Sequence, residues 1–169
     1  MAHPKHSSVQ VRYAACCGYC GISEIDAGGA LTVDHYQPVS AGGDDSDENL
    51  VYACIRCNQY KADYWPDAAA IAAGRGVLHP QRDDVTQHLR ENTQTGLLEP
   101  LTPTGAFHIA LLDLNRPQLI LHRQRVWLHA LNDNIRLSLA REVEDLRSEA
   151  QAYAQYVAQL ERMLRLRPE

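Results

Sequence analysis

The sequence predicts an α+β fold, in which a small cysteine-braced domain with two strands and a helix precedes a mainly α-helical C-terminal half. Two Cys-x-x-Cys pairs frame the first third of the chain, and short strand-like runs lie between them. Towards the C-terminus, apolar residues recur every three or four positions. These patterns are typical of a metal-braced module, of strands and of a long amphipathic helix.

The composition is that of a folded protein. The chain has 169 residues, enough for one domain with an appendage, and 45% of them are hydrophobic. It has no apolar run long enough to span a membrane, and its polar start, Met1 to Gln10, lacks the apolar core of a signal peptide. We therefore expect a cytoplasmic protein. The net charge of −5 argues against a generic basic nucleic-acid coat, but a nuclease needs only local positive charge and a metal ion.

The N-terminal elements follow from local patterns. Leu31–His35 alternates apolar and polar residues like a strand, and Leu50–Ala53 is a second short strand. Cys54–Asn58 turns into a helix that runs to about Tyr64, because Pro66 stops it. We also expect a helix at 7–15, a hairpin turn at 26–29 and a turn-rich loop at 41–47.

Further helices are expected in the second half of the chain, bounded by capping residues, Pro and Gly. The first is 67–73, which Gly74 ends, and the second is a short helix through Val85 and Leu89. The third is capped by Thr104 and runs to Leu114. The fourth is 118–131, which has Pro117 in its first turn and is broken or capped by Asn132-Asp133.

The last predicted helix is amphipathic and longer than 25 residues. Its apolar positions are Ile135, Leu139, Val143, Leu146, Ala150, Tyr153, Val157, Leu160 and Leu164. Such a stripe is too long for a small core to cover, so we expect it to pack against a second copy or a partner protein. Packing against 118–131, through Leu119, Val126 and Leu128, is the intramolecular alternative. The chain then divides into 1–66, 67–131 and 132–169.

The cysteines predict a zinc site. Of five cysteines, Cys17, Cys20, Cys54 and Cys57 form two Cys-x-x-Cys pairs, and Cys16 is left over. Four thiolates are the ligands that structural zinc prefers in tetrahedral sites. Because 33 residues separate the pairs, the metal would clip a hairpin and a loop together. The alternative is four unrelated core cysteines, and Cys16 competes with its neighbour as the ligand.

The residues between the cysteine pairs form an ordered motif. Asp34-His35 and Pro38 are followed by a Gly-Gly loop, Asn49-Leu50 and Cys57-Asn58-x-x-Lys61. In this order the segment resembles the HNH nuclease family, in the variant whose last motif residue is Asn. The resemblance implies a ββα-metal fold, with two strands and a helix around one divalent cation, and it implies hydrolysis of DNA phosphodiester bonds.

The resemblance also implies a role for each motif residue. Asp34 and Asn58 would bind the catalytic Mg²⁺ or another divalent metal, and His35 would be the general base. Asn49 would hold the loop that orients His35, and Lys61, one turn past Asn58, would contact phosphate. The chemistry agrees, because hydrolysis needs a base that titrates near neutral pH and a cation that holds charge on the leaving oxygen.

Some features depart from this pattern. The loop before Asn49 is crowded with acidic residues, namely Asp44, Asp45, Asp47 and Glu48, and would repel a duplex unless it points away or is neutralised. His79, His88 and Arg116 lie outside the motif and have no assigned role. We therefore expect a DNA endonuclease, acting as the effector of a defence, restriction or mobile-element system. The alternative is a zinc-braced adaptor that binds nucleic acid or protein without cutting.

Overall fold

The computed structural model describes residues 3–165 and contains two compact units, Met1–Arg125 and Val126–Glu169. The boundary between them lies within the last helix. The sequence divided the chain at residues 66 and 131 instead. In the structure there is no boundary at residue 66, because the chain on both sides of it belongs to the first unit, which ends at Arg125.

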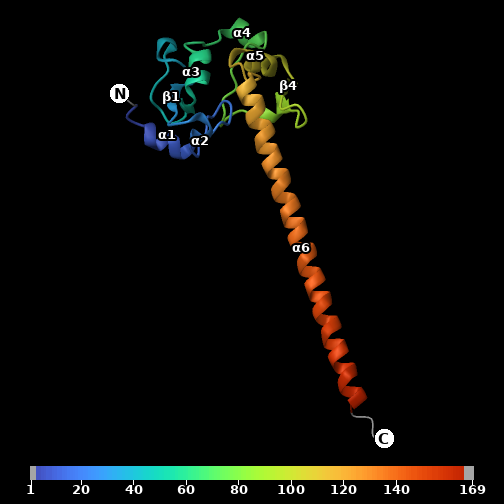
Figure 1. The fold of residues 1–169 in the computed structure, drawn as a ribbon. Helices are drawn as coiled ribbons and strands as arrows, with labels where there is room; N and C mark the ends of the chain where they lie inside the picture. The colour runs from blue at the N-terminus through green and yellow to red at the C-terminus, as the bar shows by residue number, and fades with distance from the viewer. Residues whose placement is uncertain (1–2, 166–169) are drawn as a thin grey trace. The chain divides into compact units, whose positions relative to one another are not determined.

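A two-stranded antiparallel sheet lies in the N-terminal part of the first unit, between helices α1 (His6–Arg12) and α3 (Ile55–Lys61) (Figure 1). Its strands are β1 (Thr32–His35) and β2 (Leu50–Ala53), which the sequence predicted. Helix α1 packs against both strands and α3 packs against β1. Every residue of β2 is buried, because this strand passes through the middle of the hydrophobic core. The predicted strand–strand–helix arrangement is therefore present.

Helix α3 begins at a cysteine of the predicted zinc site. Cys54 is its N-cap residue, and the Cys54 sulfur accepts a hydrogen bond from the backbone N–H of Cys57. The helix ends at Lys61, three residues before the predicted end at Tyr64. Ala62 has a φ of 46°, a left-handed value that an α-helix does not continue through.

Two predicted elements of this unit are wrong in type. The expected hairpin turn at 26–29 is the end of a short helix, α2 (Glu24–Ala27), because Ser23 caps its start and Gly28 adopts a φ of 79° at its end. The expected helix through Val85 and Leu89 is a single 3₁₀ turn, η2 (Val85–Gln87), which leads into a hairpin of β3 (Leu89–Glu91) and β4 (Leu98–Pro100).

The remaining helices of this unit differ from the predictions mainly in their ends. Helix α4 (Ala68–Ala72) is capped by Asp67. Helix α5 (Pro103–Leu111) is capped by Thr102 and not by Thr104, because the Thr102 hydroxyl accepts a hydrogen bond from the backbone N–H of Gly105.

The predicted break at Asn132-Asp133 is also wrong. Helix α6 (Pro117–Arg165) runs through both residues as one element of 49 residues. Asn and Asp each cost only about 0.7 kcal/mol relative to Ala inside a helix, and no Gly or further Pro interrupts this segment. Since 118–131 and 135–164 belong to one helix, they are not antiparallel partners of each other. Among the described residues, no helix is both long and apolar enough to cross a membrane.

Candidate active site

The four cysteines of the two Cys-x-x-Cys pairs come together in the first unit. The sulfur atoms of Cys17, Cys20, Cys54 and Cys57 all lie within 4.8 Å of one another. The Cys20 and Cys54 sulfurs are 3.8 Å apart, which equals the separation of about 3.8 Å expected between two thiolates on a tetrahedral zinc ion. Cys16 is not part of this group in the described chain. The cluster therefore has the donor set, spacing and closed form of a structural zinc site.

An arginine that directly precedes α6 covers the cysteine cluster. The Nη2 atom of Arg116 lies 3.7 Å from the sulfurs of Cys54 and Cys57 and 3.9 Å from the sulfur of Cys20. The same guanidinium donates hydrogen bonds from Nη1 to the backbone oxygens of Leu112 and Asp113, which fix its position. Four thiolates around Zn²⁺ carry a net charge of −2, so a cation here offsets that charge. Arg116, which had no assigned role from the sequence, thus contacts the cysteine cluster.

Asp34 is held in the interior beside the cysteine cluster. Its side chain is only 6% exposed. The Tyr19 hydroxyl donates a hydrogen bond to Asp34 Oδ2 at 2.6 Å, and the Lys61 ammonium lies 3.0 Å from Oδ2 and 3.2 Å from Oδ1. Burial raises the pKa of Asp34, although the Lys61 charge and the Tyr19 hydrogen bond act in the opposite direction. Tyr19 lies between Cys17 and Cys20 in the sequence, so the cluster fixes its position.

The Lys61 side chain points into the protein interior, whereas the sequence led us to expect it to contact phosphate. Lys61 is 1% exposed, and its ammonium donates to the backbone oxygen of His35 at 2.7 Å as well as to Asp34. The ammonium is directed inwards because Asp34, on the adjacent strand, carries the charge that a buried lysine requires. Lys61 therefore holds β1 and α3 together around Asp34.

His35 faces a different set of neighbours from Asp34, as alternation along β1 requires. Its Nε2 atom lies 2.6 Å from Oδ1 of Asp45, in the acidic loop. A carboxylate only accepts hydrogen bonds, so Nε2 carries the proton and Nδ1 keeps its lone pair in the neutral ring. Hydrogen bonds from His35 and His3 hold the pKa of Asp45 below its usual range. The carboxylate is therefore ionised at neutral pH.

Three hydrogen bonds of Asn49 hold the loop between the two strands. Its Oδ1 accepts a hydrogen bond from the backbone N–H of Gln37, and its Nδ2 donates to the backbone oxygens of Gln37 and Asp44. The loop passes close to itself at Gly43, where a Cβ atom would lie 1.8 Å from the Gln37 oxygen. Only glycine fits there. The Gly-Gly pair and Asn49 thus set the path of the chain that carries Asp45.

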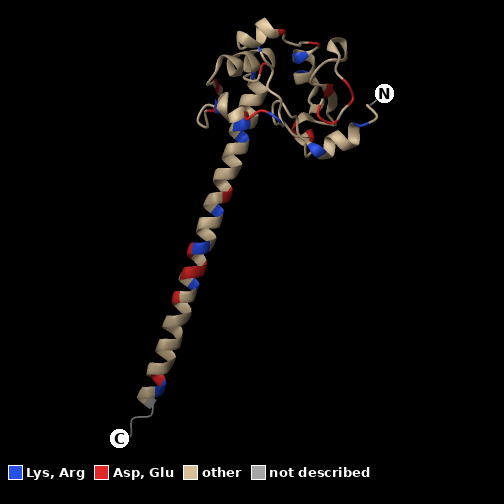
Figure 2. Ribbon diagram, turned by 180° about the vertical axis from the view of Figure 1, so that it is seen from behind, with Lys and Arg blue, Asp and Glu red and all other residues tan. Residues whose placement is uncertain are grey.

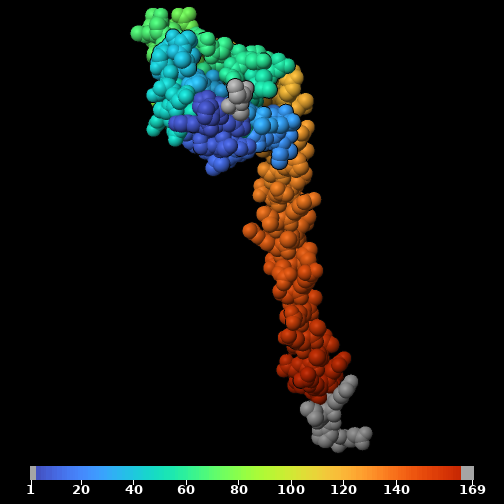
Figure 3. Space-filling model, turned by 90° about the vertical axis from the view of Figure 1, so that its left-hand side faces the viewer, coloured from blue at the N-terminus to red at the C-terminus, as the bar shows by residue number. Residues whose placement is uncertain are grey.

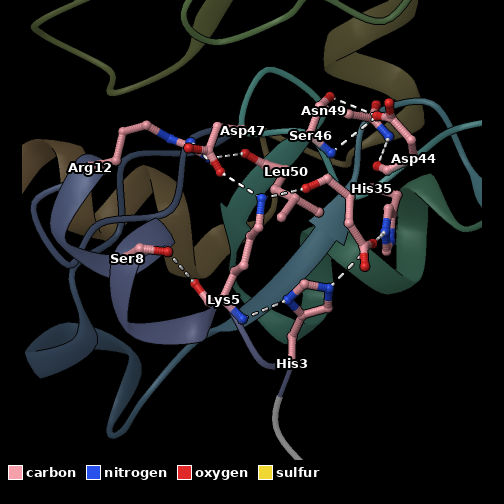
Figure 4. A network of polar contacts seen from close by, with 11 residues as sticks. His3, Lys5, Ser8, Arg12, His35, Asp44, Ser46, Asp47, Asn49 and Leu50 are labelled. Carbon is pink, nitrogen blue, oxygen red and sulfur yellow. Dashed lines mark hydrogen bonds and ion pairs between the residues drawn. The ribbon is translucent and has the colours of Figure 1, made fainter.

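Basic residues near the N-terminus neutralise part of the acidic loop (Figure 4). The ammonium of Lys5 donates to the backbone oxygen of Asp45 at 2.8 Å and to Asp47 Oδ1 at 3.1 Å. Arg12 lies 3.7 Å from the same Asp47 oxygen. These contacts tie α1 to the loop. The loop is therefore less repulsive towards a polyanion than its sequence suggests.

Three of the motif residues, Asp34, His35 and Asn58, line a common cavity of 370 Å³. Asp34 and His35 reach it from β1, and the half-buried Asn58 reaches it from the second turn of α3. The structure thus brings together the expected metal ligands and the expected base. The two histidines that had no assigned role do not line this cavity and instead form hydrogen bonds at other places. His79 Nε2 is 2.9 Å from the Glu48 backbone oxygen, and His88 Nδ1 is 2.8 Å from the Thr102 hydroxyl.

Sequence reasoning missed three residues that contact this site. Tyr19, Asp45 and His3 were not among its candidates, yet Tyr19 bonds Asp34, Asp45 bonds His35, and His3 Nε2 lies 3.4 Å from Asp45. The position of Tyr19 inside a cysteine pair was a usable signal. No sequence pattern indicated which acid of the loop would reach His35.

The comparison with known families agrees with this geometry. Residues 17–63 match the family model described as HNH endonuclease. The match begins at the first cysteine of the cluster and ends two residues after Lys61, so it covers both the cysteine cluster and the cavity. No curated protein and no solved structure matches the chain.

Proposed function

We propose that this chain, whose residues 17–63 form an HNH endonuclease domain, is a metal-dependent endonuclease that hydrolyses phosphodiester bonds in DNA. One observation carries the proposal. Inside the matched segment, Asp34, His35 and Asn58 line the same cavity although they come from a strand and a helix. A base, a carboxylate and an amide oxygen around one cavity form the set that hydrolysis with a single divalent metal requires.

In the proposed reaction, His35 takes the proton of the attacking water. Its Nδ1 is the free nitrogen, because the bond to Asp45 occupies Nε2. Asn49 holds the loop in place, and Asp45 holds the ring orientation. Lys61 fixes the Asp34 carboxylate and favours its ionised form, which counters part of the rise in pKa caused by burial. A divalent metal, when bound, would stabilise charge on the leaving oxygen.

The residues fit a divalent cation such as Mg²⁺. A carboxylate has about four acceptor positions, and the contacts from Tyr19 and Lys61 use three of those on Asp34. One position on Oδ1 is left, and the amide oxygen of Asn58 lines the same cavity. Hard oxygen donors in small number suit Mg²⁺, which keeps several waters and takes further oxygens from substrate phosphate.

A second function, a zinc-braced adaptor that binds without cutting, is favoured by one observation. The Lys61 ammonium already pairs with both oxygens of Asp34, and a cation bound at Asp34 would lie close to that positive charge. In an adaptor this buried ion pair would be purely structural.

A plasmid-cleavage assay separates the two functions. We expect the purified protein to nick or linearise plasmid DNA with Mg²⁺ or Mn²⁺ and not with EDTA. His35→Ala should lower the rate at least about 100-fold, the scale for losing a general base, while the zinc content stays at one per chain. Cleavage by His35→Ala at the parent rate would remove His35 from this role. DNA binding by the parent protein without cleavage under any divalent metal would establish the adaptor.

The assignment of metal ligands has its own test. Asp34→Asn and Asn58→Ala should each raise the Mg²⁺ concentration for half-maximal cleavage by at least about tenfold, because each removes an oxygen donor or its charge. Ser40→Ala is the matched control, since Ser40 lines the same cavity and has no assigned role. If both ligand variants titrate like the control, the assignment is wrong.

A further inference from the structure

The second unit presents an apolar face that is not covered within the described chain. This unit consists of the part of α6 from Val126 onwards, and every described side chain in the unit is exposed. The unit is one helix thick (Figure 3). Its apolar side chains include Leu146 at 59%, Tyr153 at 70% and Leu164 at 66% exposure. An apolar stripe of this length on a lone helix requires a partner in water.

The stripe follows a strict seven-residue repeat. Apolar residues occupy alternating positions three and four apart from Leu139 to Leu164, over four heptads. The d positions are Leu139, Leu146, Tyr153 and Leu160, and the a positions are Val143, Ala150, Val157 and Leu164. A repeat of 3.5 residues kept over four heptads is the sequence pattern of a coiled coil, whereas packing on a globular core needs only the 3.6-residue period of a straight helix.

We propose that residues 139–164 form a parallel, in-register, two-stranded coiled coil with a second copy of this chain. The core residues support two strands, because β-branched Val143 and Val157 occupy a positions and leucine occupies most d positions. A second copy is the partner whose repeat matches over the full length of about 39 Å, in the same register.

The charges beside the stripe support the parallel orientation. Acidic and basic residues alternate in the middle of the helix (Figure 2). In a parallel pair, Glu142 at a g position lies next to Arg147 at the following e position of the other chain, so two ion pairs form across the seam. In an antiparallel pair that overlaps over the same length, Glu142 would instead lie beside Met163 of the other chain, and Arg147 would lie beside Ala154 of the other chain. Only the parallel arrangement gains opposite charges.

Within one chain, Arg147 has a weaker option. Its Nη1 atom lies 3.6 Å from Glu144, one turn earlier on the same helix, and both side chains are more than 70% exposed. Such a surface pair contributes little to stability. Arg147 is therefore free to turn towards a second helix. A parallel dimer would also bring two nuclease units to one DNA molecule, and this consequence alone rests on the proposed function.

Light scattering coupled to size exclusion tests the dimer with the full chain. We expect a mass of about twice 18.9 kDa. Leu146→Asp should give a monomer, because it places two carboxylates in one core layer, while Ser148→Asp, at an outward f position, should remain dimeric. One zinc per chain in each variant shows that the first unit is folded. A monomer at every concentration for the parent protein, or a Leu146→Asp dimer, would overturn the proposal.

Charge reversal and cross-linking test the orientation. Arg147→Glu should weaken the dimer about tenfold, and adding Glu142→Arg should restore it, although both proteins carry the same repulsion from Glu144. Val143→Cys should form an interchain disulfide under mild oxidation, and Ser148→Cys should not. A dimer without rescue and without this disulfide would show an antiparallel pair. The parent-like dimer expected for His35→Ala keeps these results independent of nuclease activity.

Discussion

The Nε2 atom of His35 lies 2.6 Å from Oδ1 of Asp45, although one residue is in a strand and the other in an exposed loop. The position of the loop that carries Asp45 therefore determines which ring nitrogen of His35 has no bond to this carboxylate. The loop in turn depends on Asn49 and on Lys5, whose ammonium donates to the Asp45 backbone oxygen. The orientation of the proposed base is thus set by residues far from it in sequence.

Removing the Asp45 carboxylate should impair the base without disturbing the fold. We expect Asp45→Ala to lower the rate of metal-dependent DNA cleavage about tenfold or more, because the His35 ring loses its fixed orientation. Asp45→Asn should keep part of the rate, since an amide oxygen also accepts a hydrogen bond from Nε2.

Glu48→Ala is the matched control for this prediction, because Glu48 is an exposed acid of the same loop whose side chain has no hydrogen bond to the described residues. Single-turnover cleavage, zinc content and melting temperature would be measured for all three variants. Equal rates for Asp45→Ala and Glu48→Ala would show that the His35–Asp45 contact does not act in catalysis.

The cysteine cluster should contribute strongly to stability through zinc. Cys54→Ser is expected to lose the metal and to lower the free energy of unfolding by at least about 3 kcal/mol, since binding energy at a structural zinc site is also folding energy. Cys16→Ser is the control, because Cys16 lies outside the cluster. Elemental analysis and urea unfolding would measure both variants. A Cys54→Ser protein that keeps one zinc and the parent stability would contradict the four-cysteine site.

Arg116 should strengthen zinc binding without being a ligand. We expect Arg116→Gln to weaken zinc affinity about 10- to 100-fold, the usual effect of losing a group that hydrogen-bonds metal ligands. Its guanidinium lies beside three of the four sulfurs, whereas that of the exposed Arg125 does not, so Arg125→Gln is the control. Competition with a chromophoric chelator measures the affinity. If both variants release zinc alike, the Arg116 contact has no energetic effect on the site.

Local sequence patterns were sufficient for the parts of the fold that depend on near neighbours. The strands at Thr32–His35 and Leu50–Ala53 and the helix after Cys54 follow from short runs of residues, and the four-cysteine cluster follows from cysteine spacing. The hairpin of Leu89–Glu91 and Leu98–Pro100 was missed, because its strands have only three residues each, none of them is fully buried, and they show no clear alternation.

The contacts that complete the site could not be predicted in the same way, because they join distant segments. Lys61 turns inwards only because Tyr19 and β1 place the Asp34 carboxylate beneath it. Arg116 meets the cysteines across 59 or more positions of sequence. Helix periodicity and spacing do not contain this information, whereas the packed structure does.

The last prediction concerns the buried histidine of α5. His108 is 3% exposed, and its Nδ1 accepts a hydrogen bond from the backbone N–H of Leu78. Burial lowers its pKa to about 4, more than the nearby Asp83 raises it. The unfolded chain, where a histidine titrates near ~6.5, then binds more protons than the folded chain between pH 6.5 and 4. The His108 contribution to stability is therefore full above pH 6.5 and is lost as the pH falls towards 4.

Between pH 7.5 and 5.5, this difference amounts to about 1.3 kcal/mol of lost stability. Over the same pH interval, the loss in the free energy of unfolding should be smaller for His108→Asn than for the parent protein by about that amount. The reason is that the amide oxygen of Asn can replace Nδ1 as acceptor and does not titrate. Urea unfolding at the two pH values measures the difference. His79 is also buried with a lowered pKa and stays in both proteins, as does the cysteine cluster, so their effects cancel in the comparison. Equal losses for the parent and His108→Asn would show that His108 does not stay neutral in the folded protein.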